Sequence, residues 1–188
     1  DLAVALGRGQ NDDYDPNHPF LVALRTDPVL SRVKLIAEPW DLGMHGWRTG
    51  QFPPPFSEWN DRFRDSVRTF WLDDLKARSL GHQGHGVREL GTRLAGSQDL
   101  FGSRDRGPVA SVNFVAAHDG FTTADLNRYN VKHNRPNGEG NRDGSDHNRS
   151  WNHGLEGPVD GRSDAAAIET ARRRSMRNLL ATTLLATG

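Results

Sequence analysis

Apolar positions along the chain follow two periods, and together they predict short strands that alternate with helices. An apolar run at 33–37 predicts a buried strand, which Pro39 ends because proline has no N–H to donate to the ladder. Similar runs at 56–59 and 109–119 predict two more strands. Helical spacing and capping residues predict helices at 19–26, from Asp61 onward, at 87–95 and at 164–186. This alternation is typical of an α/β protein with parallel strands.

Composition narrows the class of function. The chain has 188 residues, of which 35% are hydrophobic, and this size suits one domain. Lys and Arg number 24 and Asp and Glu number 24, so the balanced charge favours neither nucleic acid nor a membrane as a partner. The sequence contains no cysteine, no long apolar span and no signal peptide. We therefore expect a cytoplasmic protein that acts on a neutral substrate.

A long stretch, 120–161, shows little periodicity and is rich in Asn, Gly, Arg and His. A loop of this length inside a compact domain is usually functional or disordered. The aspartates and histidines between residues 133 and 153 are of types that bind metals: His133, Asp143, Asp146, His147 and His153. Their spacing matches no compact ligand pattern, so we predict a polar, sugar-facing loop, with no metal and no cofactor. The basic cluster Arg172–Arg174 in the last predicted helix is expected to be a solvated face.

Ionisable residues end two of the predicted strands. Glu38 directly follows the first strand, and His118 and Asp119 end the third. Catalytic groups of barrels and open parallel sheets gather at the carboxyl ends of strands. Asp1 obeys the same rule if the residues before it form a strand, and it precedes Glu38 by 37 residues, the length of one strand–helix unit. We expect the three carboxylates to converge on one mouth.

Such a group of carboxylates suits carbohydrate chemistry. A retaining glycosidase needs two carboxyl groups about 5 Å apart, one to attack the anomeric carbon and one to protonate the leaving oxygen. Four aromatic residues near them suit stacking on sugar rings: Trp40, Trp47, Phe52 and Trp59. Asn60 ends the second predicted strand and is expected to face the substrate, whereas Phe63, Phe70 and Trp71 lie at helical spacing and are expected in the core. These features together favour a carbohydrate enzyme.

Four sequence blocks carry a family resemblance. They are "KLIAEPWDLG", "FPPPFSEWNDRFRDSVRTFW", "VNFVAAHDGFTTADL" and "YNVKHNRPNGEGNRDG". In this order they resemble the glycogen debranching enzymes of the isoamylase type, within the α-amylase superfamily of glycoside hydrolases. The resemblance covers nearly the whole chain. It implies a (β/α)8 TIM barrel, of which residues 1–188 are a fragment running from the end of strand four to the helix before strand eight.

The resemblance also implies a role for each candidate site residue. Asp1 matches the nucleophile, Glu38 the general acid/base, and Asp119 the carboxylate that stabilises the distorted sugar in the transition state. His118, Trp40 and Asn60 are assigned to substrate binding. Glu38 has to be protonated first, so we expect burial and a neighbouring carboxylate to raise its pKa. The implied reaction is hydrolysis of α-1,6 branch linkages in glycogen or limit dextrin, and the implied partner is therefore a branched α-glucan.

Two other functions stay open. The superfamily shares its three carboxylates, so the chain fits equally an enzyme that acts on another α-glucan, for example one that releases trehalose. A glucan-binding homologue without catalysis would use the same aromatic and amide side chains. The preference for an α-1,6 bond is implied only by the loop "HNRPNGEGNRDG" and by "SEWNDRFRD". Half a barrel exposes two sheet edges, so the isolated fragment is expected to be poorly stable and inactive.

Overall fold

The computed structural model describes residues 1–104 and 106–188, which form two compact units. The first unit comprises Asp1–Asp61, Thr92–Asn113 and Ala186–Gly188, and the second comprises Arg62–Gly91 and Phe114–Leu185. The helices are α1 (Pro19–Thr26), α2 (Asp61–Arg68), α3 (Asp74–Ser79), α4 (Arg88–Leu94), α5 (Gln98–Phe101) and α6 (Ala165–Leu185). The strands are β1 (Ile36–Ala37), β2 (Ser57–Trp59) and β3 (Ser111–Val112). No helix in the described part of the chain is both long and apolar enough to cross a membrane.

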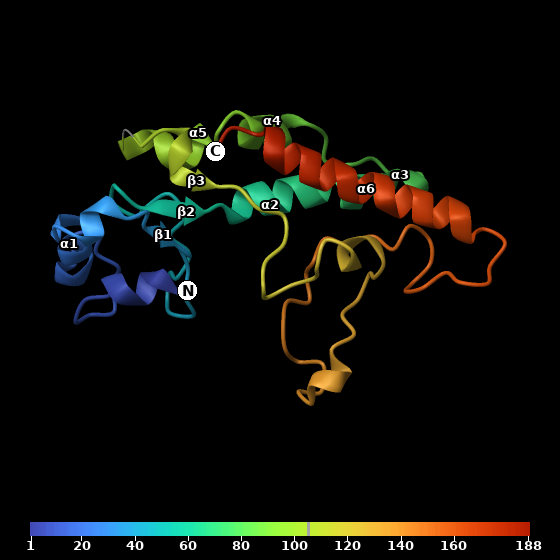
Figure 1. The fold of residues 1–188 in the computed structure, drawn as a ribbon, viewed down its shortest axis with the longest axis horizontal. Helices are drawn as coiled ribbons and strands as arrows, with labels where there is room; N and C mark the ends of the chain where they lie inside the picture. Colours follow the sequence, from blue (N-terminus) through green and yellow to red (C-terminus); the bar gives the residue numbers. More distant parts are fainter. Residues whose placement is uncertain (105) are drawn as a thin grey trace. The chain divides into compact units, whose positions relative to one another are not determined.

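The first unit contains a small parallel sheet in the order β1-β2-β3 (Figure 1). Its register places Glu58 of β2 between Ala37 of β1 and Ser111 of β3. Order in the sheet thus follows order in the sequence. The predicted α/β class with parallel strands is confirmed.

The first strand is shorter than predicted. It begins at Ile36 rather than Val33, although the Ser57 N–H donates to the Leu35 carbonyl oxygen (2.8 Å) and extends the ladder by one residue. Val33 and Ile36 are both nearly half exposed, whereas Ala37 is buried. The apolar run therefore buries one face of a short strand.

The third strand also departs from its predicted range of 109–119. It consists of Ser111 and Val112 alone. Pro108 opens a 3-10 turn, Pro108–Ala110, just before it, and proline is well suited to the first position of such a turn. Strand β2 is three residues long and ends where α2 begins, so it pairs with only two residues of β3.

Helix α1 has the predicted bounds. Pro19 occupies its first turn, and the His18 Nδ1 accepts a hydrogen bond from the Phe20 N–H (3.3 Å). At the other end the Asp27 carboxylate accepts from two following backbone N–H groups, and these bonds lower its pKa. Leu21 of the helix is fully buried. The core that it joins consists of Ala3, Val4, Leu21, Ala37, Phe52 and Phe56.

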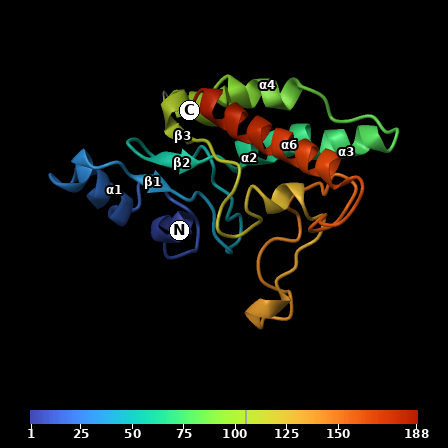
Figure 2. The ribbon, with the colours of Figure 1, turned by 45° about the vertical axis from the view of Figure 1, so that its right-hand side comes forward.

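The second unit is built on helices. A π-helical turn, Thr69–Asp73, joins α2 to α3, and helix α6 lies beside these segments in two views (Figures 1 and 2). The Trp71 Nε1 donates to the Thr182 Oγ1 (2.9 Å) and links the π turn to α6. The predicted helical faces bury Phe63 and Val67 completely, whereas Phe70 and Trp71 are only partly buried.

The long loop 120–161 contains two 3-10 turns, Asp125–Asn127 and Arg135–Asn137, and is otherwise irregular. Hydrogen bonds hold it along its length. The Trp151 N–H donates to the Leu126 carbonyl (3.0 Å), and the side chain of Asn152 donates to Glu156 (2.8 Å). Many of the loop's polar side chains therefore bind the loop itself.

The prediction of a solvated face at Arg172–Arg174 is wrong for Arg172. Its side chain is 1% exposed, whereas Arg173 and Arg174 are exposed. The guanidinium donates to the carbonyl oxygens of Gly157 (2.8 Å) and Asn152 (3.1 Å). The loop lacks regular structure, so its carbonyls take donors from the helix, and this need draws one arginine of the cluster inward.

Candidate active site

Glu38 lies where β1 ends, held by the first residues of the chain. Its residue is 3% exposed. The backbone carbonyl of Glu38 accepts a hydrogen bond from the Ala3 N–H (3.0 Å), and its carboxylate accepts one from the Leu2 N–H. The segment 1–3 therefore runs beside the carboxyl end of β1. Pro39 follows and has no N–H to donate to the ladder, so Glu38 lies directly after Ala37, the last residue of β1.

Asp1 is brought next to Glu38 by the same contacts. A carboxylate oxygen of Asp1 and one of Glu38 lie within 4.8 Å of each other. The residue between Asp1 and the helical turn Ala3–Gly7 is Leu2, at φ 48° and ψ 43°, in the left-handed region that side chains other than glycine rarely adopt. Such strained residues cluster at functional sites. The structure thus pairs two of the three predicted carboxylates.

A bidentate ion pair ties together the loops that follow the two acids. The Arg8 Nε donates to the Asp41 Oδ2 (2.7 Å) and its Nη2 to the Asp41 Oδ1 (2.6 Å). The hydrogen bond from Arg8 holds the pKa of Asp41 below its usual range. Arg8 is seven residues after Asp1, and Asp41 is three after Glu38, so the pair restrains the separation of the acids. This ion pair was not predicted from the sequence, although the Asp in "EPWD", close after Glu38, indicates that a cationic partner is needed nearby.

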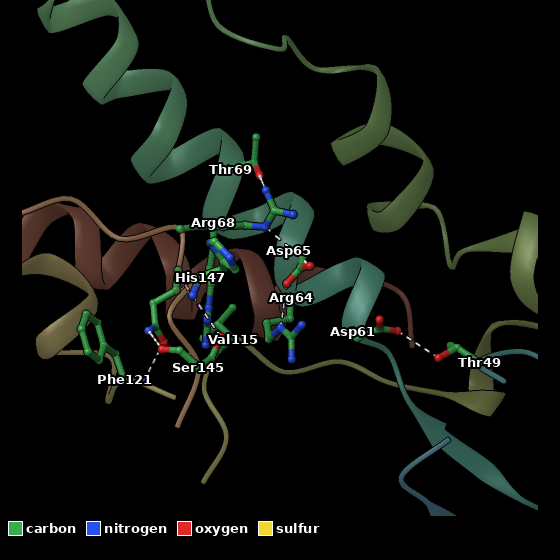
Figure 3. A network of polar contacts seen from close by, with 12 residues as sticks. Thr49, Asp61, Arg64, Asp65, Arg68, Thr69, Val115, Phe121, Ser145 and His147 are labelled. Atoms are coloured by element: carbon green, nitrogen blue, oxygen red, sulfur yellow. Dashed lines mark hydrogen bonds and ion pairs between the residues drawn. The ribbon is translucent and has the colours of Figure 1, made fainter. Parts of the chain in front are cut away.

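Trp40 contacts a second tryptophan. Its ring centroid lies 6.4 Å from that of Trp59 at an interplanar angle of 56°, and both residues are partly buried. Trp47 is fixed differently, because its Nε1 donates to the Asp61 Oδ2 (2.8 Å), while the Thr49 Oγ1 donates to the Asp61 Oδ1 (2.9 Å; Figure 3). Stacking of Trp40 on a sugar ring stays a prediction.

Asn60 has a buried position. It is 0% exposed, and its amide nitrogen donates to the Ser97 Oγ and to the Ser111 Oγ, both at 2.9 Å. Its backbone N–H donates to the Val112 carbonyl (3.1 Å). Both amide hydrogens are thus engaged within the unit, which suits a structural role. Contact of Asn60 with a substrate stays a prediction that this burial disfavours.

Glu58 is a buried carboxylate that sequence reasoning missed. It forms an ion pair with Arg106 and accepts hydrogen bonds from the N–H groups of Gly50 (2.6 Å) and Phe52 (3.2 Å). Arg106 also donates to the Phe56 carbonyl (2.6 Å). Burial raises the pKa of Glu58 against the opposing effect of Arg106. A carboxylate in the middle of a predicted strand is a signal that a partner exists.

His118 and Asp119 belong to the second unit. The His118 Nε2 lies 3.2 Å from the Asp119 Oδ1, and both side chains are exposed. They line a polar cavity of about 360 Å³, together with residues of the long loop that include Lys132, Asn134, Asn137 and Ser145. The Ser145 N–H donates to the Asp119 carbonyl (2.9 Å). Convergence of Asp119 with Asp1 and Glu38 stays a prediction.

Arg68 fixes the chain on both sides of this pair (Figure 3). Its Nε donates to the Val115 carbonyl (2.7 Å) and its Nη1 to the Asn148 carbonyl (3.2 Å). Burial and the neighbouring cations lower the pKa of Arg68 to about 10. The Asn148 side chain in turn accepts from the Phe121 N–H (3.0 Å). The segment that carries Asp119 is thus held from residue 115 to residue 121.

Four of the loop's five candidate metal ligands have side-chain partners of their own. The contacts are His133 Nε2 to Glu156 Oε1 (3.1 Å), Asp146 Oδ1 to Lys132 Nζ (2.9 Å), Asp143 Oδ2 to Asn137 Nδ2 (2.8 Å), and His153 Nε2 to Asn127 Oδ1 (3.2 Å). Burial, aided by the charge of Arg172, lowers the pKa of His153 to about 4. These contacts assign the side chains to loop structure.

Comparison with known proteins gives consistent similarities over the whole chain. The chain is 49% identical over 189 residues to the glycogen debranching enzyme of Serratia proteamaculans, and 48% identical over 188 residues to that of an Enterobacter species. It is also 48% identical over 188 residues to the glycogen operon protein GlgX homolog of Mycobacterium tuberculosis. Each alignment covers 100% of this chain and 26%, 26% and 24% of the relative, respectively.

The chain therefore spans about a quarter of the length of the curated relatives it matches. No protein-family model matches it. The four blocks that suggested the family all lie within the aligned residues, since the alignments cover the complete chain. The chain is homologous, over its whole length, to a segment of the glycogen debranching enzymes.

Proposed function

We propose that the chain is part of an enzyme that hydrolyses α-1,6-glucosidic branch linkages in glycogen or limit dextrin. Relatives that share about half of its residues carry the name glycogen debranching enzyme. We assign Asp1 as nucleophile, Glu38 as general acid/base and Asp119 as the carboxylate that stabilises the distorted sugar. His118 and Trp40 contact the substrate beside them.

The reaction takes two steps. The Asp1 carboxylate attacks the anomeric carbon, while the carboxylic acid of Glu38 gives its proton to the departing oxygen of the main chain. A water then attacks the glycosyl-enzyme, and the Glu38 carboxylate takes the proton of that water. Two inversions return the original anomeric configuration.

The proximity of Asp1 and Glu38 is the observation that carries this mechanism. Their carboxylate oxygens lie within 4.8 Å. Retaining glycosidases hold the two carboxyl groups about 5 Å apart, whereas inverting enzymes need about 6.5–9.5 Å to admit a water. The Arg8–Asp41 ion pair restrains the loops that follow these acids.

We further propose that residues 1–188 form roughly the C-terminal half of the catalytic (β/α)8 barrel. The parallel strands β1, β2 and β3 follow one another in sheet order as strands five, six and seven of such a barrel do. The segment 1–3 runs beside the end of β1. In a complete barrel, the end of strand four would lie at this position, next to strand five.

Substitution of Glu38 by Gln in the full-length protein tests the mechanism. The amide has almost the size of the acid but carries no transferable proton, so we expect kcat on limit dextrin to fall about 10³-fold. Binding of glucan, measured by affinity electrophoresis, should be retained. Product analysis should find short linear maltooligosaccharides from the wild type.

Glu89→Gln on α4 provides the matched control, because it makes the same acid-to-amide change at an exposed glutamate outside the candidate active site. It should hydrolyse limit dextrin like the wild type. Unchanged turnover in Glu38→Gln would contradict the assignment of Glu38. Glucan binding without turnover in the wild type would instead support a binding homologue, and release of trehalose would support the other enzyme class.

A further inference from the structure

A second cavity adjoins the one that contains Asp119. It has a volume of about 760 Å³ and is lined by residues of the long loop that include Val131, His133, Arg135 and Pro136. Lys132 lines both cavities. The two hollows therefore share one wall.

The shared wall is built from well-anchored groups. The Lys132 side chain is 7% exposed, and its ammonium group lies 2.9 Å from the Asp146 carboxylate and 3.3 Å from the Gly144 carbonyl oxygen. The hydrogen bond and charge of Lys132 lower the pKa of Asp146. A wall held in place before binding needs no ordering when a ligand arrives.

A pair of asparagines closes the loop behind this wall. The Asn141 Oδ1 accepts from the Asn134 N–H (2.7 Å), and the Asn141 Nδ2 donates to the Lys132 carbonyl (3.3 Å). Asn134 also donates to the Asp143 carbonyl (3.1 Å). The second cavity and the Asp119 cavity are thus held by the same set of hydrogen bonds within the loop.

The lining of the second cavity suits a sugar chain. Val131 is 60% exposed and offers an apolar surface at this cavity, and Pro136 offers a second one. His133 and Arg135 add polar groups at the same cavity. Sugar rings present apolar C–H faces and rims of hydroxyls, so a lining that combines apolar surfaces with polar and charged groups matches them.

A branch point in a glucan has two arms that an enzyme must admit together, the branch that leaves and the main chain that stays. We propose that the second cavity binds the main chain, while the branch enters the cavity of Asp119 and the Lys132 wall divides them. This inference rests on the proposed debranching function and deepens it. It makes Arg135 a specificity-determining residue for branched substrates.

Arg135→Ala in the full-length protein tests this role with two substrates. One is limit dextrin. The other is a maltooligosaccharide joined by an α-1,6 bond to a single glucose, so that this substrate has a branch but no main chain. We expect the ratio of kcat/KM for limit dextrin to kcat/KM for the small substrate to fall about fivefold, the effect of one net hydrogen bond. The loss should appear in KM for limit dextrin.

Arg142→Ala is the control, because Arg142 belongs to the same loop and lines neither cavity. Its Nε donates to the Glu139 carbonyl (3.1 Å). The substrate ratio of this variant should equal that of the wild type. An unchanged ratio in Arg135→Ala, or equal losses on both substrates, would overturn the main-chain assignment. A wild type that cleaves neither substrate would refute the proposed function instead, so the two failures are distinguishable.

Discussion

Both units of the chain bury arginines, and Arg106 of the first unit and Arg172 of the second find their partners in different ways. In the first unit Arg106 faces a carboxylate, Glu58, in the middle strand of the sheet. In the second unit Arg172 donates mainly to backbone carbonyls of the long loop, those of Asn152, Leu155 and Gly157. One guanidinium neutralises a charge, and the other replaces missing secondary structure.

The difference follows from the backbone around each arginine. Strand β2 pairs with β1 and with β3, so backbone groups of the sheet bind one another. The loop 120–161 has no such ladder, and its buried carbonyls need donors from elsewhere. Arg68 likewise donates to backbone carbonyls, those of Val115 and Asn148, as Arg172 does to those of the loop. Buried arginines are thus part of how this irregular loop is ordered.

The largest effect is expected from removing the cation in the sheet. Arg106→Met should leave Glu58 as a buried, unpaired charge, which costs about 3–5 kcal/mol. Hydrogen exchange of the segment 50–58 in the full-length protein measures the loss as a lower free energy of local opening. Adding Glu58→Gln should restore at least half of it, because no charge is then left unpaired.

A slightly smaller effect is expected at Arg172. Arg172→Met should open its carbonyl partners to water, so the total loss should stay at about 1–3 kcal/mol, the cost of one buried group left without a partner. Hydrogen exchange of residues 150–158 should report it. Adding Glu169→Gln should restore nothing, since the lost partners are backbone groups. Recovery by Glu169→Gln would show that the Arg172–Glu169 contact (3.0 Å) is the main one and would remove the contrast with Arg106.

The smallest effect is a pH dependence in the second unit. The pKa of His153 is lowered from 6.5 to about 4, so its neutral form is favoured in the fold. Its contribution is complete above pH 6.5 and is lost as the pH falls from 6.5 toward 4, because only the unfolded chain then takes up the proton. The loss should be about 1 kcal/mol once solvent screening of this partly exposed group is allowed for.

The thermal midpoint of the full-length protein at pH 7 and pH 4.5 measures how much stability is lost through His153 on acidification. His153→Gln removes the titration but keeps a hydrogen-bond donor for the Asn127 Oδ1. Its midpoint should therefore fall less on acidification than that of the wild type. Equal falls would mean that His153 is protonated in the fold despite its burial beside Arg172.

Some features could be predicted from residues that lie close together in the sequence. Helix α1 has its predicted bounds because Pro19 and Asp27 act within a single turn at each end. Glu38 could be placed at a strand end for the same reason, since Pro39 follows it directly. The relation of Asp1 to Glu38 was predictable from the repeating length of strand–helix units, and the contacts of Leu2 and Ala3 agree with it.

Other features depended on partners far along the chain. Asn60 stands at a strand end like Glu38, yet Ser97 and Ser111 enclose it, and both follow it by more than 35 positions. The run 109–119 has the composition of a long strand, but a strand lasts only as far as its neighbour, and β2 is three residues long. The local sequence of a strand does not show how long the strand that pairs with it will be.

The sequence by itself determined the α/β class, the bounds of α1 and the candidate acids at strand ends, because periodicity, proline and capping act over a few residues. Only the tertiary structure decided which polar residues are buried and for what purpose. Arg172 and Arg173 are adjacent and identical in type, yet one is enclosed by loop carbonyls and the other is exposed. The reason is that a buried backbone must be paired wherever the chain happens to leave it unpaired, and only the folded chain shows where that is.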